Sequence, residues 1–381
     1  MQLLRGVVDP ELGSDIVDLG MAKGVQVVDG VVTVTIALTT IGCPLKGQIQ
    51  KDIRNRLATT PGVERVDLDW TEMTAAEKSA CMDKARFNAA QRAGETEIPL
   101  TTKVLAVSSG KGGVGKSSVT VNLAVALARE GRTVGVLDAD IGGFSVPRML
   151  GLDGRLSGAT DARKIVPIEL AVGAGLLKVV SMGFLVEDEE SALLWRGQLL
   201  NRAVQHFLED VRWGPMDYLV IDMPPGTGDI QMGLARMLPR AQVLIVTTPA
   251  VGAQKVAARA ADLARRTYLP VAGVIENMSS FTCDHGETYD LFGTGGGATL
   301  AADIGVPLLG SVPLEPGVST GGDTGRPAAL GTGPAADAFR AIARRIVDEA
   351  VPPVDMESCT ARLFESVEAA LGPRKPLPSR A

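Results

Sequence analysis

The chain has 381 residues, of which 45% are hydrophobic, so it is long enough for two or three domains and can bury a sizeable core. A formal net charge of −6 gives no overall attraction to nucleic acid, and 4% aromatic residues leave few surfaces on which bases can stack. No apolar run is long enough to span a bilayer, and Met1–Gly6 lacks the apolar stretch of a signal peptide, so we expect a cytoplasmic protein with no membrane or nucleic-acid partner.

Residues 1–75 are expected to form a small α+β domain. Val25–Ile36 alternates between polar and apolar residues around Asp29-Gly30, a pair typical of a two-residue hairpin turn. A helix over Lys46–Thr59 and a third strand over Val63–Trp70 follow. These elements are enough for one small sheet covered by one helix.

Three further segments follow this domain. Residues 76–102 are charged and alanine-rich, and we expect a partly helical linker. In residues 103–350, continuous β-branched runs alternate with helical patterns, which predicts an α/β domain with a mostly parallel sheet covered on both faces. The predicted strands are Lys103–Ser108, Thr133–Leu137, Leu177–Val180, Tyr218–Ile221, Val243–Val246 and Val271–Ile275. Residues 351–381 form a C-terminal tail in which Ala361–Leu371 has helical periodicity.

The four cysteines, Cys43, Cys81, Cys283 and Cys359, are far apart in the sequence and form no C-x-x-C pair. Neither a disulfide framework nor a closed zinc site is therefore indicated. Cys43 precedes Pro44 and the predicted helix, whose N-terminus would lower the pKa of the thiol. It is either a reactive thiolate that receives or passes metal, or an inert core thiol.

A phosphate-binding loop lies directly after the first strand of the α/β domain. The eight residues fit the G-x-x-x-x-G-K-[ST] pattern, in which backbone N–H groups wrap an anion, the lysine meets the terminal phosphates and the hydroxyl binds Mg²⁺. They are Gly110, Lys111, Gly112, Gly113, Val114, Gly115, Lys116 and Ser117. A helix over Ser118–Arg129 then points its N-terminus at the phosphates, so we expect ATP and Mg²⁺ to bind here.

Lys111 is an unusual feature of this loop, because it directly follows the first glycine. A side chain at this position cannot easily fold back onto the ligand of its own loop. Its charge is therefore available to a nucleotide that is bound by a neighbouring subunit, which predicts a homodimer.

Aspartates follow two of the predicted strands. Asp222 follows Tyr218–Ile221 and is placed to support Mg²⁺, while Gly226 lets the backbone approach a γ-phosphate. Asp138 and Asp140 follow Thr133–Leu137, and Asp140 is placed to orient the attacking water. Aspartates at strand ends also cap the next helix, and this alternative stays open, for Asp138 above all.

Asn277 ends another predicted strand. Its amide offers both a donor and an acceptor, so it can read the edge of an adenine. The alternative is an asparagine that caps a helix or takes a left-handed backbone conformation.

Four motifs together resemble the Mrp/ApbC/Nbp35 family of iron–sulfur carrier ATPases, whose deviant Walker A loop has a lysine where this chain has Lys111. They are Gly110–Ser117, Asp138-Ala139-Asp140, Met223–Asp229 and Glu276–Ser279. The first domain is similar to the MIP18 (DUF59) module that is fused to this ATPase. Its matching stretches are Asp9–Leu12, Ile16–Met21, Leu38–Leu45 and Pro61–Val63.

The resemblance implies a SIMIBI-like P-loop ATPase homodimer that carries a [4Fe–4S] cluster at its interface and delivers it to apoproteins. It implies a catalytic role for Lys116 and Asp140, and for Lys111 across the dimer. Ser117 and Asp222 would hold Mg²⁺. The cluster would be bound by the thiolates of a C-P-x-C motif from each subunit, and the matching stretch here is Phe281–Glu287.

This chain departs from that motif, because Cys283 matches the first cysteine and Gly286 occupies the second position. Two subunits would supply two thiolates, whereas a cubane cluster ordinarily takes four cysteines. The missing ligands come from His285, from Cys43 or Cys359, or from a small thiol or the client. Otherwise the protein is an adaptor ATPase that has lost firm cluster binding. A MinD/ParA-like positioning ATPase is the alternative from another functional class.

Overall fold

The computed structural model describes residues 1–9, 12, 14–39, 46–58, 60–92, 96–153, 156–158, 164–185, 197–226 and 229–353. The chain divides into two compact units, Met1–Gly94 and Glu95–Ala381, and each is described by itself. The expectations for Cys43, Cys359 and a helix over Ala361–Leu371 fall outside the described residues.

The first unit contains a three-stranded sheet and two α-helices, as expected for a small α+β fold. Its elements are a 3₁₀ helix at Gln2–Leu4, β1 (Val8–Asp9), β2 (Ser14–Asp15), β3 (Ala22–Val28), β4 (Val31–Leu38), α1 (Lys46–Ala58), β5 (Arg65–Glu72) and α2 (Ala75–Arg92). β4 is the central strand, antiparallel to β3 and parallel to β5. The predicted turn at Asp29-Gly30 is confirmed, with φ of 45° and 75°.

The core of the first unit follows from the two periodicities of its elements. Ile49, Ile53 and Leu57, one helical turn apart on α1, are all buried. On β4 every second side chain, Val32, Val34 and Ile36, is buried as well. The helix therefore provides an apolar stripe, and the central strand provides one apolar face.

Helix α2 lies within the segment that we expected as a partly helical linker, and it belongs to the first unit. Its start is a reciprocal cap, because the Thr74 hydroxyl accepts from the Glu77 amide and the Glu77 carboxylate accepts from the Thr74 amide. Lys23 and these bonds to Thr74 lower the pKa of Glu77 to about 2. Cys81 on the same helix is buried, which raises its thiol pKa to about 11 and leaves it inert near neutral pH.

The second unit is built on an eight-stranded sheet. In the order β10-β11-β7-β12-β6-β13-β14-β17, every neighbouring pair is parallel except β10 and β11. The strands are β6 (Lys103–Ser109), β7 (Thr133–Asp138), β10 (Ile168–Val172), β11 (Gly175–Ser181), β12 (Tyr218–Asp222), β13 (Gln242–Thr247), β14 (Val271–Asn277) and β17 (Leu308–Val312). The predicted mostly parallel sheet is confirmed, and β10 and β17 are edge strands that the sequence analysis missed.

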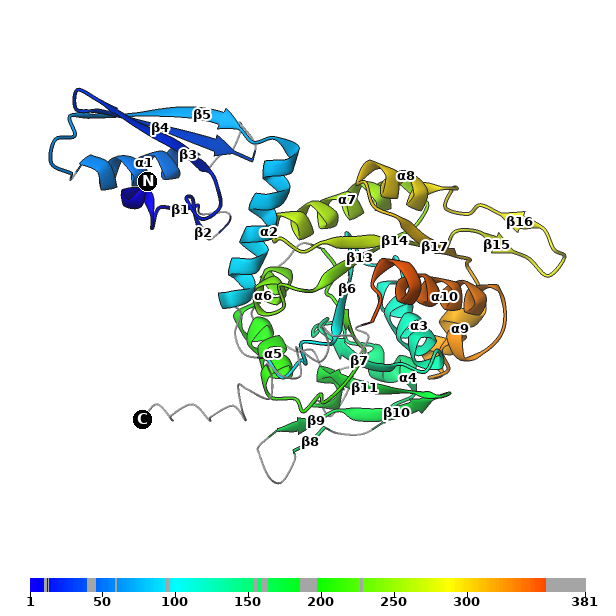
Figure 1. Ribbon diagram of the computed structural model, residues 1–381. Coiled ribbons are helices and arrows are strands. Elements are labelled where there is room, and N and C mark those ends of the chain that lie inside the picture. The colour runs from blue at the N-terminus through cyan, green and yellow to red at the C-terminus, as the bar shows by residue number, and fades with distance from the viewer. Residues whose placement is uncertain are drawn as a thin grey trace. The chain divides into compact units, whose positions relative to one another are not determined.

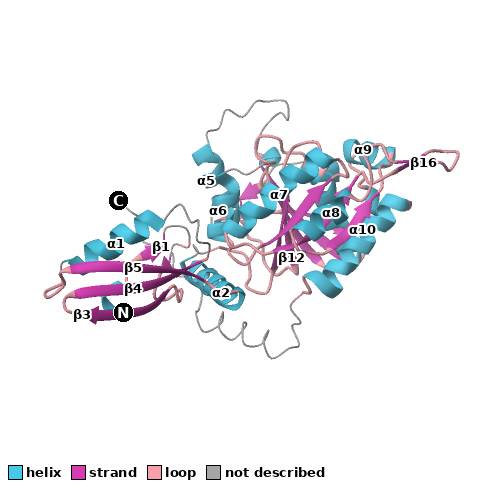
Figure 2. Ribbon diagram, turned by 90° about the horizontal axis from the view of Figure 1, so that it is seen from above, coloured by secondary structure: helices cyan, strands magenta, loops and turns pink. Residues whose placement is uncertain are grey.

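Helices cover both faces of this sheet (Figures 1 and 2). They are α3 (Lys116–Arg129), α4 (Val146–Leu150), α5 (Gly197–Glu209), α6 (Asp229–Met237), α7 (Val251–Arg266), α8 (Gly296–Asp303), α9 (Pro316–Asp323) and α10 (Pro334–Arg345). Minor elements are β8 (Ser157–Gly158), β9 (Ile165–Val166), β15 (Phe281–Thr282), β16 (Thr288–Tyr289), 3₁₀ turns at Met182–Phe184 and Ala328–Leu330, and a π-helical turn at Ile346–Ala350.

Two apolar clusters fill the space between the sheet and its helices. Leu105 and Val107 of β6 belong to one cluster, with α3 and α10, whereas Val104 and Ala106 belong to the other, with α5, α6, α7 and α8. Successive side chains of a strand point to opposite faces, so a strand buried on both faces must be apolar throughout. This requirement explains the continuous apolar runs from which the strands were predicted.

Among the described residues, no helix is both long enough and apolar enough to cross a membrane.

We predict that Phe339→Ala destabilises the protein by about 3–5 kcal/mol, because it removes a fully buried ring from the cluster that α10 shares with α3. Leu330→Ala removes a side chain that is 45% exposed and should change the free energy of unfolding by less than about 0.5 kcal/mol. Urea denaturation of the two variants measures both values. Equal effects would contradict this account of the core.

Candidate nucleotide-binding site

The phosphate-binding loop connects β6, in the middle of the sheet, to the N-terminus of α3. Two of its glycines have no room for a side chain. A Cβ atom at Gly110 would lie 2.2 Å from the carbonyl group of Val256 on α7, and one at Gly115 would lie 2.2 Å from Nδ2 of Asn277. Gly115 also has a φ of 76°, which a side chain would disfavour. The loop is therefore shaped by its neighbours as well as by its expected ligand.

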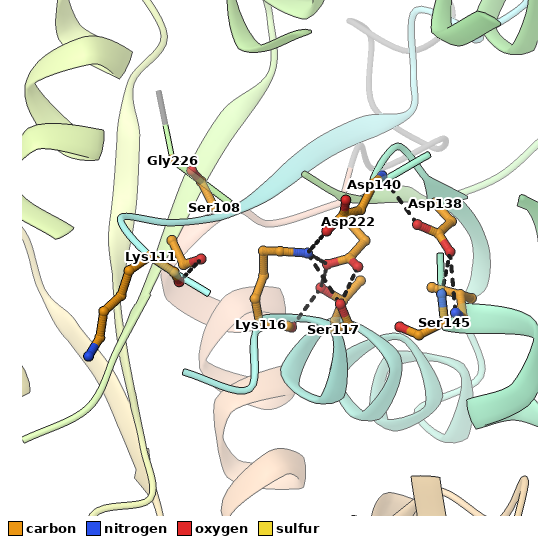
Figure 3. Close-up of polar contacts among 12 residues, drawn as sticks. Ser108, Lys111, Lys116, Ser117, Asp138, Asp140, Ser145, Asp222 and Gly226 are labelled. Carbon is orange, nitrogen blue, oxygen red and sulfur yellow. Dashed lines mark hydrogen bonds and ion pairs between the residues drawn. The ribbon is translucent and has the colours of Figure 1, made fainter. Parts of the chain in front are cut away.

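Asp222, at the end of β12, gathers three donors from α3 (Figure 3). Its carboxylate accepts from Nζ of Lys116 at 2.7 Å, from Oγ of Ser117 at 2.5 Å and from Oγ1 of Thr120 at 2.8 Å. Asp222 is fully buried and Lys116 is 6% exposed. An ion pair this deep needs further hydrogen bonds to offset desolvation, and the two hydroxyls supply them. The structure thus brings together Lys116, Ser117 and Asp222.

Asp140 completes this charged group from the loop after β7. Its Oδ2 lies 3.8 Å from Nζ of Lys116. Burial raises the pKa of Asp140, and the charge of Lys116 opposes that rise. A carboxylate with a raised pKa, partly open to solvent beside the loop, is suited to hold a water and accept its proton.

Asp138 is directed away from the loop, toward the start of α4 (Figure 3). Its Oδ2 accepts from the amides of Ser145 and Val146 at 3.1 and 3.2 Å, and from the Ser181 hydroxyl at 3.1 Å. These bonds correspond to the capping alternative of the sequence analysis. Burial, and secondarily the charge of Asp222, raises the pKa of Asp138 to about 7.

Gly226 lies in the loop between β12 and α6. Its amide donates to the carbonyl of Ser109 at 3.1 Å, so the group expected to approach a γ-phosphate is bonded to β6. Gln231 on α6 donates to both the Gly226 carbonyl and the Ser108 hydroxyl, at 2.8 and 2.9 Å. Gln231 therefore links the loop after β12 to strand β6.

Lys111 extends away from Lys116 and Asp222 (Figure 3). Its side chain is exposed, and its carbonyl accepts from the Ser109 hydroxyl at 3.0 Å. The structure does not bring Lys111 into the phosphate site of its own chain, and its action on a neighbouring subunit stays a prediction.

Asn277 lies against the loop from the other side, at the end of β14. Its Nδ2 donates to the Val114 carbonyl at 2.9 Å. The structure thus places Asn277 as a support of the loop, and a role in reading adenine stays a prediction. The preceding residue, Glu276, accepts from the Gly297 amide at the start of α8.

Cys283 lies in a hairpin formed by β15 and β16. Its amide donates to the Glu287 carbonyl, and the Gly286 amide donates back to the Cys283 carbonyl, both at 2.9 Å. Gly286 has a φ of 84°, so the turn favours glycine at the position of the second cysteine. Within the described part of the chain, no group of three or more His, Cys, Asp or Glu side chains is arranged to hold a metal ion.

Two of the supporting residues were missed from the sequence. Thr120 lies four residues after Lys116, one turn further along α3. Residues with this spacing lie on the same face of a helix, so the predicted helix could have shown that Thr120 faces the site together with Lys116. Gln231 carried no such signal, because one of its partners, Ser108, lies on a strand that is 123 residues away in the sequence.

Comparison with known families shows to which family the chain belongs. Residues 101–347 match the family described as NUBPL iron-transfer P-loop NTPase, and residues 1–68 match the family described as iron-sulfur cluster assembly protein. The chain belongs to the Mrp/ApbC family of iron–sulfur cluster carrier P-loop NTPases. The fold and the family predicted from the sequence are both confirmed.

Relatives named iron-sulfur cluster carrier protein match nearly the whole chain. The one from Deinococcus radiodurans is 43% identical over 92% of this chain and 94% of its own length. The one from Synechocystis sp. is 42% identical over 91% and 95%. A nucleotide-binding protein from Archaeoglobus fulgidus, solved with ADP, is 32% identical with a TM-score of 0.51, over 65% of this chain and 93% of that one.

Asp138 gives the carrier a testable pH dependence. Its pKa is raised from 3.8 to about 7, so the folded protein binds a proton here that the unfolded chain loses between those values. This contribution to stability is complete below the lower pKa and lost as the pH rises through the higher one. Asp138→Asn cannot titrate.

We therefore expect the free energy of unfolding of the wild type to fall, relative to Asp138→Asn, as the pH rises from about 5 to about 8. Urea denaturation at several pH values measures this difference. Asp262→Asn changes a carboxylate that is 61% exposed and serves as control. A constant difference between wild type and Asp138→Asn across this range would contradict the assignment.

Proposed function

We propose that this iron–sulfur cluster carrier binds and hydrolyses MgATP at the loop Gly110–Ser117, and that hydrolysis switches a homodimer between states that hold and release a cluster. The observation that carries the proposal is the buried contact of Lys116 and Ser117 with Asp222. These groups are what a P-loop NTPase needs to bind phosphate and Mg²⁺, and here they already touch.

The residues present fit both ligands. Lys116 is released from Asp222 when its ammonium meets the terminal phosphates, and the loop amides surround them together with the N-terminus of α3. Ser117 and Asp222 would hold Mg²⁺ between a hydroxyl and a carboxylate. Bound Mg²⁺ supplies positive charge that neutralises the phosphate oxygens. The carboxylate of Asp222 would thus exchange the ammonium of Lys116 for Mg²⁺, so that its negative charge stays compensated.

Asp140 and Lys111 are the proposed catalytic groups beyond the loop. Asp140 lies beside Lys116, and its raised pKa favours taking a proton from an attacking water. Lys111 leaves its own site, so its charge would stabilise the transition state at the nucleotide of the partner subunit. Hydrolysis would then depend on the dimer, because each site would need Asp140 from its own chain and Lys111 from the other.

The cluster is the cargo of this reaction, and we propose Cys283 as its ligand from each subunit. A homodimer supplies two such thiolates, fewer than the four of an ordinary cubane cluster. The open coordination positions would be filled by a group that leaves when the cluster passes on. Client apoproteins with free thiolates are therefore the expected acceptors.

We predict that Lys116→Ala abolishes ATP binding, because the loop loses the charge that meets the terminal phosphates. Lys111→Ala should spare ATP binding and lower the hydrolysis rate by about 10³-fold, as for an arginine finger supplied in trans. Equilibrium titration with a fluorescent ATP analogue and a phosphate-release assay separate the two effects. Normal turnover by Lys111→Ala would refute the cross-subunit role.

We also predict that Cys283→Ser lowers the amount of iron bound after anaerobic reconstitution with iron and sulfide. Cys81→Ser is the matched control, because this thiol is buried in the first unit and should have no effect on iron content. Visible absorption and iron counting provide the measurement. Unchanged iron content in Cys283→Ser would exclude the hairpin as the cargo site.

A further inference from the structure

The cysteine hairpin belongs to an excursion of the chain, Met278–Gly296, that leaves the end of β14 and returns at α8 (Figure 1). Its base is closed, because the Gly297 amide donates to Oε2 of Glu276 at 2.5 Å. Its first residues are held by the edge strand, since the Ser279 amide donates to the Val312 carbonyl at 3.0 Å. Residues before and after the hairpin are thus fixed close to the end of β14.

Asn277, the last residue of β14, and Met278, the first residue of the excursion, lie beside the phosphate-binding loop. Asn277 is 4% exposed, and its Nδ2 donates to the Val114 carbonyl at 2.9 Å. The terminal methyl carbon of Met278 lies 3.5 Å from where a Cβ atom on Gly115 would be. Both residues thus lie at the part of the loop that directly precedes Lys116, and Asn277 is hydrogen-bonded to it.

Met278 also has an uncommon backbone conformation. Its φ is 56°, in the left-handed region, which costs a residue with a side chain free energy. Such a conformation persists only where the surrounding contacts enforce it. Here these contacts include the bond from Asn277 to the loop on one side and the bond from Ser279 to β17 on the other.

We propose that Asn277 and Met278 are positioning residues that couple nucleotide binding at the loop to the conformation of the Cys283 hairpin. The inference rests on the proposed function, because it takes the loop as the nucleotide site. Phosphates turn the loop amides toward themselves, and the Val114 carbonyl belongs to the same peptide chain. A shift of that carbonyl changes the bond to Asn277, and the strained peptide at Met278 transmits the change to Cys283, five residues further on.

This coupling has a thermodynamic counterpart. If nucleotide shifts the hairpin between two conformations, cargo that prefers one of them must change nucleotide affinity by the same factor. The link therefore gives a carrier a way to make cluster release depend on the nucleotide state. It acts within one chain, in addition to any effect across a dimer.

The test follows the reactivity of the Cys283 thiol in the full-length, iron-free protein. A pulse of N-ethylmaleimide with and without a saturating non-hydrolysable ATP analogue, followed by peptide mass spectrometry, gives the alkylation rate of each cysteine separately. Cys81 is buried and serves as an internal control for general unfolding. In the wild type we expect the nucleotide to change the Cys283 rate by about fivefold, the lower end of typical coupling between sites.

Asn277→Asp is the decisive variant, because it keeps the shape of the side chain and replaces the donor to Val114 with a carboxylate oxygen; the added charge is matched in the control. We expect it to abolish the nucleotide-dependent change at Cys283, measured at a nucleotide concentration that saturates the variant. Asn122→Asp is the matched control. Asn122 on α3 is equally buried, and its Nδ2 donates to the Ser118 carbonyl at 2.8 Å, but it has no contact with the excursion among the described hydrogen bonds.

Met278→Gly provides a second variant that leaves the Asn277 bond in place. Glycine adopts positive φ without cost, so the change at Cys283 should shrink while nucleotide affinity persists. A wild-type protein that binds nucleotide with no change at Cys283 overturns the coupling and leaves the proposed function standing. The coupling is also overturned if nucleotide changes the alkylation rate of Cys283 in both Asn277→Asp and Met278→Gly by as much as in the wild type. A wild type that binds no nucleotide overturns the inference together with the proposed function.

Discussion

The buried charge of Asp222 is the constraint around which the nucleotide site is organised. A carboxylate with no exposed surface costs several kcal/mol unless it is paired and hydrogen-bonded. Lys116, Ser117 and Thr120 provide this compensation from consecutive turns of one helix. The start of α3 is therefore held against the end of β12, and this fixes one end of the loop that connects β6 to the helix.

The parallel sheet makes this arrangement possible. Its strands β7, β12, β6 and β14 end at the same edge, and each delivers a functional segment there: Asp138 to Asp140, Asp222 to Gly226, the phosphate-binding loop, and Glu276 to Asn277. Ligands of open α/β sheets bind at this edge. The site is thus made from four separate segments of the sequence, each of which lies at the end of a different strand. Gln231 then links the loop after β12 to β6, and Asn277 links the end of β14 to the phosphate-binding loop.

The hairpin of Cys283 shows how a backbone preference can limit the ligands that a proposed cargo site offers. A turn with Gly286 at a φ of 84° is closed by two hydrogen bonds between Cys283, Gly286 and Glu287. This turn presents one cysteine side chain, which is the proposed cargo ligand. A carrier must bind its cargo and also give it up, so a ligand set that is incomplete within the protein is consistent with transfer.

The sequence by itself determined the class of fold, the family, and the identity of the phosphate-binding loop, because these depend on local signals. Continuous apolar runs report strands buried on both faces, and a glycine-rich loop between a strand and a helix reports an anion site. It also placed Asp222 and Asp140 at strand ends near that loop. Only the tertiary structure decided what each polar group bonds. Asp138 and Asp140 are two residues apart on one strand end, yet one caps α4 and the other lies beside Lys116. Asn277 supports the phosphate-binding loop through a hydrogen bond that the sequence did not predict, and its reading of adenine stays a prediction. Gln231 gave no signal in the sequence. The bonds from Asn277 to Val114 and from Gln231 to Ser108 join residues more than a hundred positions apart, so the packing of the whole sheet, and no local pattern, selects them.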